Sequence, residues 1–303
     1  MLSITLKVSA AMKIMDKIFS IAKRTKVRVL IGVEETESQV TRVINAAKKA
    51  IDEGYAKVTL LGKHQTLKKY KDEFEVFMNS KLEEDMVRAL IEHDFDAAVR
   101  GSLGDSKILL SLKEKLNLSK VFRLALLESA NGQQFFFAPV GIDEGESIGE
   151  KLVFVEEGVN LVKALGLEPK VAIISGGRRD DIGRSPRVDR MLADSEFVVS
   201  FTKDKGITNN IKHYEVLIEN AMKENANIII APDGISGNLM YRTLIHLGGG
   251  KSHGAPFLKI NIDLVDTSRA GPISEYVSSI AFAGALKDLR KKRNQHDLYT
   301  QDI

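Results

Sequence analysis

Short apolar, β-branched runs alternate with amphipathic helical patterns along all 303 residues of this chain. No other feature limits the possible folds as strongly. The β-type runs are KVRVLIGV (26–33), KVTLLG (57–62), DAAVRG (96–101), QQFFFAPV (133–140), PKVAIISGG (169–177), EFVVSF (196–201) and III (228–230). Strands that alternate with helices of roughly 10–15 residues indicate βαβ units and a mainly parallel sheet. We therefore expect an α/β fold, and the length favours roughly two domains.

The helical segments are predicted from apolar residues spaced along one helix face. They include one led by Thr36, which forms a possible capping box with Gln39. They also include LVFVEEGVNLVKALGL (152–167) and a helix over about 210–225. At the N-terminus, one apolar stripe predicts an amphipathic helix: Met12, Met15, Ile18, Phe19 and Ala22. No linker separates the two expected domains, so the second is expected to be a compact insertion in the first.

Charges interrupt the N-terminal segment, which therefore lacks the continuous apolar centre of a signal peptide. No run approaches the roughly 20 apolar residues of a membrane span. We expect a soluble cytoplasmic protein without a membrane partner. The 44 basic and 41 acidic residues give a net charge of +3, too balanced to indicate a nucleic-acid partner.

Several common chemistries lack their motifs. The chain has no cysteine, which excludes disulfides, a thiolate nucleophile and a zinc site built on cysteines. Its six histidines include no pair at i, i+4. There is no strand-linked G-x-G-x-x-G, P-loop or G-x-S-x-G elbow. We expect no metal site and no tightly bound cofactor.

Ligands of parallel sheets lie beyond the carboxyl ends of the strands, so the loops that follow strands are the candidate sites. In APDGISGNLM (231–240), Ser236, Gly237 and Asn238 lie where a helix begins. Free N–H groups and the helix dipole favour an anion there, and glycine lets it approach the backbone. The alternative is that Asp233 or Ser236 only caps the helix.

Two further loops carry arginines. Arg100 is the last residue of the run AAVR, so we expect its charged side chain to lie beyond the carboxyl end of the strand, where ligands bind. Residues 176–190 hold five arginines and three aspartates: Arg178, Arg179, Arg184, Arg187, Arg190, Asp180, Asp181 and Asp189. Such a loop could clamp phosphates, with Arg178 and Arg179 closest to the strand. The alternative is a solvated loop of mutual ion pairs.

The last candidate is DTSRAGPISEYV (266–277). Ser268, Arg269 and Glu275 place a hydroxyl, a guanidinium and a carboxylate within eight residues. Together they could bind an anion and move a proton. The alternative is a turn followed by an acidic residue in the first turn of a helix.

The C-terminal part of the chain resembles the phosphate acetyl- and butyryltransferase family. The matching features are Pro232 with Asp233, Gly237 with Asn238, Gly248 with Gly249, the run 254–256, and Ser268 with Arg269. The strand at 169–175 also resembles the family's central strand. The resemblance covers roughly the last 135 residues and is topological before them. As a whole, the chain is similar to a divergent branch of methanogenic archaea, named as subunit X of a proposed methyltransferase (Mtx subunit X).

This resemblance implies an α-β-α, two-domain fold of the isocitrate/isopropylmalate dehydrogenase type, with the active site in the interdomain cleft. The first domain would comprise residues 1–145 and 255–303, and residues 146–254 would form the inserted second domain. A homodimer is implied, with an acyl phosphate and coenzyme A, or acyl-CoA, as substrates. By family role, Arg269 would hold the phosphate, Ser268 would support the transition state, and Glu275 would take the thiol proton. A thiol with a pKa near 8.5 needs such a base at neutral pH.

The chain departs from the family pattern at several positions. Glu275 stands where the family usually has Asp, residues 265–267 replace Asn-Asp-Leu, and residues 176–190 replace a Ser-Thr-Lys-Gly loop. One alternative function is a methyltransferase, or a methyltransferase-associated subunit with a corrinoid partner. The chain lacks the strand-linked glycine-rich loop that usually binds S-adenosylmethionine, and this weakens the interpretation as a methyltransferase. Another alternative is a non-catalytic protein that binds an anion or other ligand.

Overall fold

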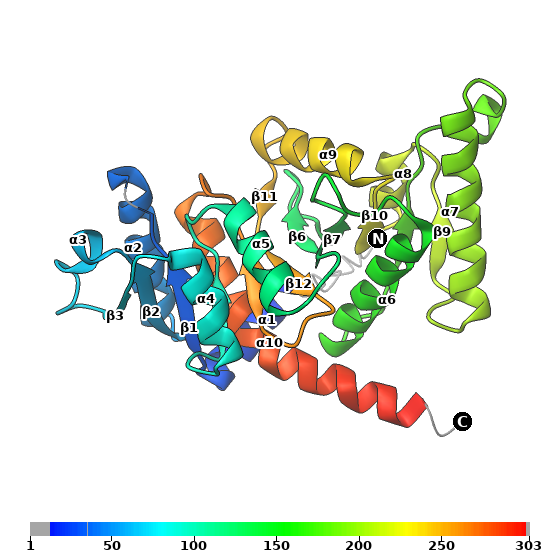
Figure 1. Cartoon of the computed structure of the whole chain (residues 1–303). Helices are drawn as coiled ribbons and strands as arrows, with labels where there is room; N and C mark the ends of the chain where they lie inside the picture. Colours follow the sequence, from blue (N-terminus) through cyan, green and yellow to red (C-terminus); the bar gives the residue numbers. More distant parts are fainter. Residues whose placement is uncertain (1–12, 35, 301–303) are drawn as a thin grey trace, which may run out of the picture.

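The computed structural model describes residues 13–34 and 36–300, with side chains up to residue 293. Within these residues the strands form a seven-stranded and a six-stranded sheet. Figure 1 shows the strands β1, β2 and β3 at one end of the molecule and α7 with β9 at the other. The α/β class and the mainly parallel pairing expected from the sequence are confirmed.

The first sheet has the order β3-β2-β1-β4-β13-β12-β5. Its strands are β1 (Arg28–Gly32), β2 (Lys57–Gly62), β3 (Glu75–Met78), β4 (Ala97–Val99), β5 (Phe122–Arg123), β12 (Ala255–Leu258) and β13 (Leu264–Asp266). Pairing is parallel from β3 to β13, and β12 is antiparallel to both its neighbours. Val99 pairs with Val265, so Arg100 and Asp266 leave the sheet side by side.

The second sheet has the order β11-β6-β7-β10-β8-β9. Its strands are β6 (Ala125–Glu128), β7 (Gln134–Ala138), β8 (Val171–Ile173), β9 (Ile211–His213), β10 (Ile228–Ile230) and β11 (Lys251–Ser252). The strands β7, β10, β8 and β9 are parallel, whereas β6 is antiparallel to β7 and β11. The loops that follow β7, β8 and β10 therefore meet at one edge of this sheet.

Helices cover both faces of both sheets because neighbouring strand residues point to opposite faces. The helices are α1 (Ile14–Thr25), α2 (Glu37–Asp52), α3 (His64–Leu67), α4 (Leu82–Ile91), α5 (Asp105–Lys115), α6 (Ile148–Ala164), α7 (Pro186–Asp204), α8 (Ile218–Lys223), α9 (Gly234–His246) and α10 (Ile273–Thr300). In β1, Val29 and Ile31 pack with α2 and α10, whereas Leu30 packs with α4 and α5. In the second sheet, Ile228 and Ile230 face α6, and Ile229 faces the α8 and α9 side.

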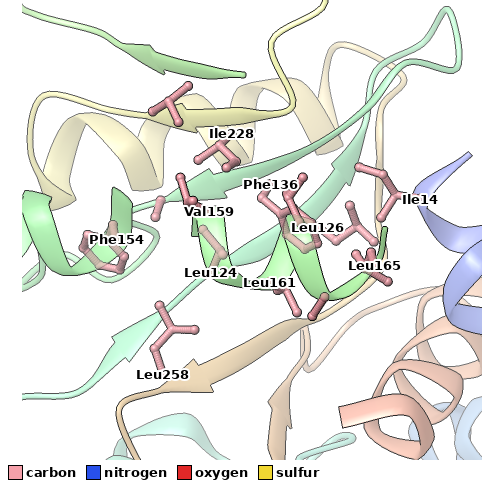
Figure 2. Close-up of a cluster of buried hydrophobic side chains, with 14 of the residues drawn as sticks. Ile14, Leu124, Leu126, Phe136, Phe154, Val159, Leu161, Leu165, Ile228 and Leu258 are labelled. Carbon is pink, nitrogen blue, oxygen red and sulfur yellow. The ribbon is translucent and has the colours of Figure 1, made fainter. Parts of the chain in front are cut away.

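The core on the α6 face joins the two halves of the structure. Figure 2 shows side chains of α6, including Phe154 and Leu161, packed with Phe136 of β7, Ile14 of α1 and Leu258 of β12. Phe154 is fully buried and meets the Phe122 ring edge-on at 5.4 Å. Because α1 and α10 contribute to the cores of both sheets, this packing fixes the cleft described below.

Along the sequence, the strands pass from the first sheet to the second and then back to the first. The first change falls between β5 and β6, and the second between β11 and β12. The division predicted from the sequence placed residues 1–145 in the first domain, whereas β6 and β7 pair within the second sheet. The division into domains stays a prediction. None of the described helices has the length and apolar character needed to cross a membrane.

Three local predictions were wrong. The run 196–201 lies inside α7, where small polar residues share the buried stripe with Leu192 and Val198 and so obscure its helical period. The helix predicted over about 210–225 is instead β9 followed by the short α8. Thr36 precedes α2 as expected, but its hydroxyl contacts the side chain of Gln39 and makes no capping bond to the backbone. Met12 of the predicted N-terminal stripe lies outside the described residues.

Truncation of a core side chain tests the packing. We expect Phe154→Ala to lower the free energy of unfolding by about 3–5 kcal/mol, because a fully buried ring leaves a cavity. The matched control is Phe197→Ala, whose ring is 50% exposed and should cost less than about 1 kcal/mol. Urea unfolding of both variants measures the difference, and equal losses would contradict this packing.

Candidate active site

A cavity of about 370 Å³ lies between the two sheets. The first sheet and its loops contribute Arg100, Arg123, Asp266 and the turn 267–270, and α10 contributes Glu275. The other wall comes from the second sheet and α9, with Val140, Asn238, Tyr241, Arg242, His246 and Ser252. The cavity therefore joins residues more than 150 positions apart in the chain, such as Arg100 and Glu275.

A chain of buried charges lies beside this cavity, and three of its four members, Arg100, Arg123 and Asp266, line it. Arg123 donates from Nε to Glu144 Oε1 at 2.8 Å and from Nη1 to Asp266 Oδ2 at 2.8 Å. The other oxygen of Asp266 accepts from Nε of Arg100. Arg100 also donates to the carbonyl oxygens of Leu103 and Thr267. The four charged side chains Arg100, Arg123, Glu144 and Asp266 are all buried.

The guanidinium groups of Arg100 and Arg123 keep the Asp266 carboxylate ionised. Burial acts to raise the pKa of Asp266, but Arg100 and Arg123 outweigh it and hold the pKa below its ordinary value. Burial is also the largest influence on Glu144, where Arg123 offsets it only in part, so the pKa of Glu144 is raised. Asp266 therefore stays ionised between two cations, and it fixes the turn that follows β13.

Glu275 has a different environment, although it belongs to the same cavity. It is 2% exposed, and its Oε1 accepts from the backbone N–H of Ser268 at 2.8 Å. Burial raises the pKa of Glu275 from 4.5 to about 7 and the charge of Asp266 adds to this, while the Ser268 N–H, the Ser252 hydroxyl and Arg100 oppose it. A carboxyl group with such a pKa can take up and release a proton near neutral pH.

Cations surround the mouth of the cavity. Arg269 is more than half exposed, and its nearest carboxylate oxygen, Glu34 Oε1, is 3.9 Å from Nη2. On α9, Arg242 and His246 are exposed and have no hydrogen-bond or ion-pair partner among the described residues. The single Tyr276 hydroxyl proton is shared between the carbonyl oxygens of Ser268 at 3.1 Å and Arg269 at 2.9 Å, which fixes this turn. An anion at the mouth would meet several uncommitted donors.

Five of the residues selected from the sequence line this cavity: Arg100, Asn238, Ser268, Arg269 and Glu275. Asn238 donates to the carbonyl oxygen of Val140 at 2.8 Å. The structure places Arg178 and Arg179 elsewhere, exposed in the loop after β8. Arg179 pairs there with Glu196 at 2.7 Å, as in the solvated alternative considered for this loop.

The first turn of α9 is closed by protein atoms. Asp233 Oδ1 accepts from the backbone N–H of Ser236 at 2.7 Å, so the helix is capped from within. A Cβ atom on Gly237 would lie 2.1 Å from the carbonyl oxygen of Pro139, which explains the need for glycine there. Asp233, Ser236 and Gly237 do not line the cavity between the sheets. The glycine lets the helix approach the loop after β7.

Sequence reasoning missed several residues of the site, chiefly Arg123, Glu144, Tyr241 and Ser252. Arg123 lies in a two-residue strand and Ser252 in another, and neither has a recognisable pattern. The motif at 266–277 includes Asp266, but its pattern does not indicate a role for this residue. Among the described residues, no group of three or more His, Cys, Asp or Glu is placed to hold a metal ion.

Solved structures that superpose on this chain include phosphotransacylases and a dehydrogenase. A branched-chain phosphotransacylase from Enterococcus faecalis superposes with a TM-score of 0.70 at 17% identity, over 87% of this chain and 99% of that one. A phosphotransacetylase from Streptococcus pyogenes gives 0.65 at 16% identity, over 91% and 98%. A 4-hydroxythreonine-4-phosphate dehydrogenase from Klebsiella pneumoniae gives 0.52 at 9%, over 88% and 99%. At these identities the likeness defines the fold class.

Sequence relatives identify the family. A protein of Methanosarcina barkeri named "Putative methyltransferase mtx subunit X" is 43% identical over 274 residues, which is 90% of this chain and 98% of the relative. The protein of the same name from Methanosarcina mazei is 42% identical over 93% of this chain and 98% of its own length. No protein-family model matches the chain. The chain belongs to the Mtx subunit X family, as the sequence resemblance predicted.

Removal of the central carboxylate tests the buried charge chain. We expect Asp266→Asn to cost about 3–5 kcal/mol of unfolding free energy, because it leaves two buried guanidiniums without their shared partner. Glu84→Gln breaks an exposed pair with Lys81 and is the matched control, with no measurable change expected. Chemical unfolding compares the two, and a mild effect at Asp266 would show that the buried chain is not essential.

The raised pKa of Glu275 predicts a pH-dependent stability. Below pH 4.5 the group is protonated in both states, so its stabilising contribution is fully present. As pH rises through about 7, the folded protein retains a proton that the unfolded chain has lost, and roughly 3 kcal/mol of stability disappears. Glu275→Gln should lack this loss, so it gains stability relative to the parent between about pH 5 and about pH 8. Parallel pH dependences for the two proteins would exclude the shift.

Proposed function

We propose that this protein transfers an acyl group between phosphate and coenzyme A. The observation that carries the proposal is the turn 268–275, which puts a buried carboxyl group with a pKa of about 7 beside a serine and an exposed arginine. The fold shared with phosphotransacylases supports it. Coenzyme A enters as a substrate and not as a tightly bound cofactor.

In the proposed reaction the thiol sulfur attacks the carbonyl carbon of an acyl phosphate. Glu275 takes the thiol proton, the new C–S bond forms, and the C–O bond to phosphate breaks. Arg269 neutralises the departing phosphate, and Arg242 and His246 offer further donors at the mouth. Ser268 supports the oxyanion of the tetrahedral intermediate. The products are acyl-CoA and phosphate, and the proton leaves from Glu275.

Glu275 is well suited to this role, although the family pattern usually has the shorter aspartate. One oxygen is held by the Ser268 N–H, which fixes the orientation of the carboxylate. A Cβ atom on Gly271 would lie 2.8 Å from the other oxygen, so glycine leaves room beside it. The turn therefore has room for the longer side chain of Glu275.

An assay with coenzyme A and a panel of acetyl, butyryl and isobutyryl phosphates tests the proposal through loss of free thiol. We expect turnover whose kcat/KM rises with pH to a plateau above about pH 7, since the base must be ionised. Glu275→Gln should reduce it by about 10²–10⁴-fold, and Arg269→Ala by at least about tenfold. Arg88→Ala, in α4 and outside the lining of the cavity, is the control with unchanged turnover. No thiol loss with any acyl phosphate would refute acyl transfer.

A second candidate is a role in methyl-group metabolism, as a methyltransferase or as a subunit associated with one. The observation that favours it is the name of the relatives, which calls them subunits of a methyltransferase. A corrinoid protein is the proposed partner in that case. Co-purification with a corrinoid protein, together with absent thiol loss, would favour this candidate. Absence of both would leave a non-catalytic protein that binds an anionic ligand.

We also propose that the protein is a homodimer. Large apolar residues are well exposed along α9, namely Ile235 and Leu239 on the helix and Leu247 directly after it. Such a face is unusual on a monomer and supports burial against a second copy. Light scattering of the purified protein, with Leu239→Lys as the disrupting variant, tests this assembly.

A further inference from the structure

A second cavity of about 300 Å³ lies at the carboxyl-end edge of the second sheet. It is lined by the loop after β7, by the start of α7 and by the first residues of α9, with Lys151 entering from α6. The carboxyl ends of parallel strands are where ligands of α/β folds bind. Val140 lines the cavity between the sheets, whereas Ile142 lines this one, so the same loop borders both.

Lys151 is the unusual residue of this cavity. It is only 3% exposed, yet among the described residues its side-chain amine has no hydrogen-bond partner and no carboxylate oxygen within 4.0 Å. The neighbouring acids are already paired: Asp194 with Arg190 at 2.7 Å, and Asp233 with Arg187 at 2.9 Å. An ammonium group on so buried a side chain is costly for the fold when no partner offsets its charge. Such a residue indicates a ligand that supplies the missing negative charge.

The surroundings define the chemistry of that ligand. Each arginine of the cavity already faces a carboxylate, and the remaining acid, Glu146, is exposed to solvent, so Lys151 is the buried cation that has no ion-pair partner. A single negative charge balances it, whereas a phosphate dianion would add repulsion from Asp194 and Asp233. The rest of the lining is mostly apolar, with Ile142, Met191 and Ile235.

Burial lowers the pKa of Lys151, and the charges of Asp194 and Asp233 offset this only in part. A bound anion close to the amine would restore the charged form. The cavity volume of about 300 Å³ is at the small end for organic ligands. This volume is too small for a nucleotide and fits a compact organic molecule.

We propose that this cavity is a binding site for a small organic carboxylate, with its single negative charge on the Lys151 amine and its apolar body against Ile142, Met191 and Ile235. The site is separate from the cavity that contains Glu275, and the proposal does not depend on acyl transfer. A carboxylate is favoured because its single charge matches the single unpaired cation, and because most of the lining is apolar.

The test uses the full chain with hexanoate, benzoate and inorganic phosphate, and with hexanamide as the uncharged analogue of hexanoate. Calorimetric titration should show binding of at least one carboxylate, with hexanamide about tenfold weaker or more and phosphate unable to compete. Lys151→Met should weaken carboxylate binding by a similar factor. Lys163→Met, on the same helix but exposed, is the matched control and should bind as the parent does. Arg269→Ala should also bind as the parent does, because it alters only the other cavity.

A stability measurement separates a ligand site from a structural lysine. If Lys151 is kept for a ligand, then Lys151→Met removes an unpaired buried charge and should raise the melting temperature of the unliganded protein. A lower melting temperature would assign the amine a structural role and overturn the proposal. It would also be overturned if no carboxylate binds at millimolar concentration, if Lys151→Met binds as well as the parent, or if Arg269→Ala abolishes binding.

Discussion

The ion pairs of Asp266 with Arg100 and Arg123 are the contact on which the rest of the site depends. Arg100 follows β4, Arg123 lies in β5 and Asp266 ends β13, so one carboxylate joins three strands of the first sheet. Through Arg123 the contact reaches Glu144, in the loop after β7 of the second sheet. A buried charge pair tolerates little displacement, because each partner would be left desolvated and alone. The relative position of the two walls is therefore tied to these bonds.

This arrangement also sets the electrostatics of Glu275. The ionised Asp266 lies near enough to disfavour a second negative charge, and burial acts in the same direction. Both effects raise the pKa of Glu275 into the range where a carboxyl group exchanges protons near neutrality. Asp266 itself stays charged because the two guanidiniums hold it there. Two acids in one cavity thus have opposite pKa shifts, which is a common arrangement in sites that move protons.

The loop from Pro139 to Glu146 has a double role. On one side it contributes Val140 to the cavity between the sheets, and on the other it contributes Ile142 to the cavity of Lys151. Its central residue Glu144 belongs to the buried charge chain. The first turn of α9 packs on the same loop, where Gly234 and Gly237 leave room for its carbonyl oxygens. The loop is therefore held from several sides, although it has no regular secondary structure.

The sequence by itself determined the order of most strands and helices, the α/β class and the turn that carries Ser268, Arg269 and Glu275. These features depend on local periodicity, turn residues and short motifs, which can be read without knowing which segments meet. The helical periodicity could not be recognised at 196–201, because small polar residues lie on the buried stripe of α7. Only the tertiary structure decided that Arg100, Arg123 and Asp266 share one buried contact, that Asp233 caps α9 from within, and that Lys151 is buried without a partner. Burial and pairing depend on contacts between distant segments, and no local pattern in a single chain records them.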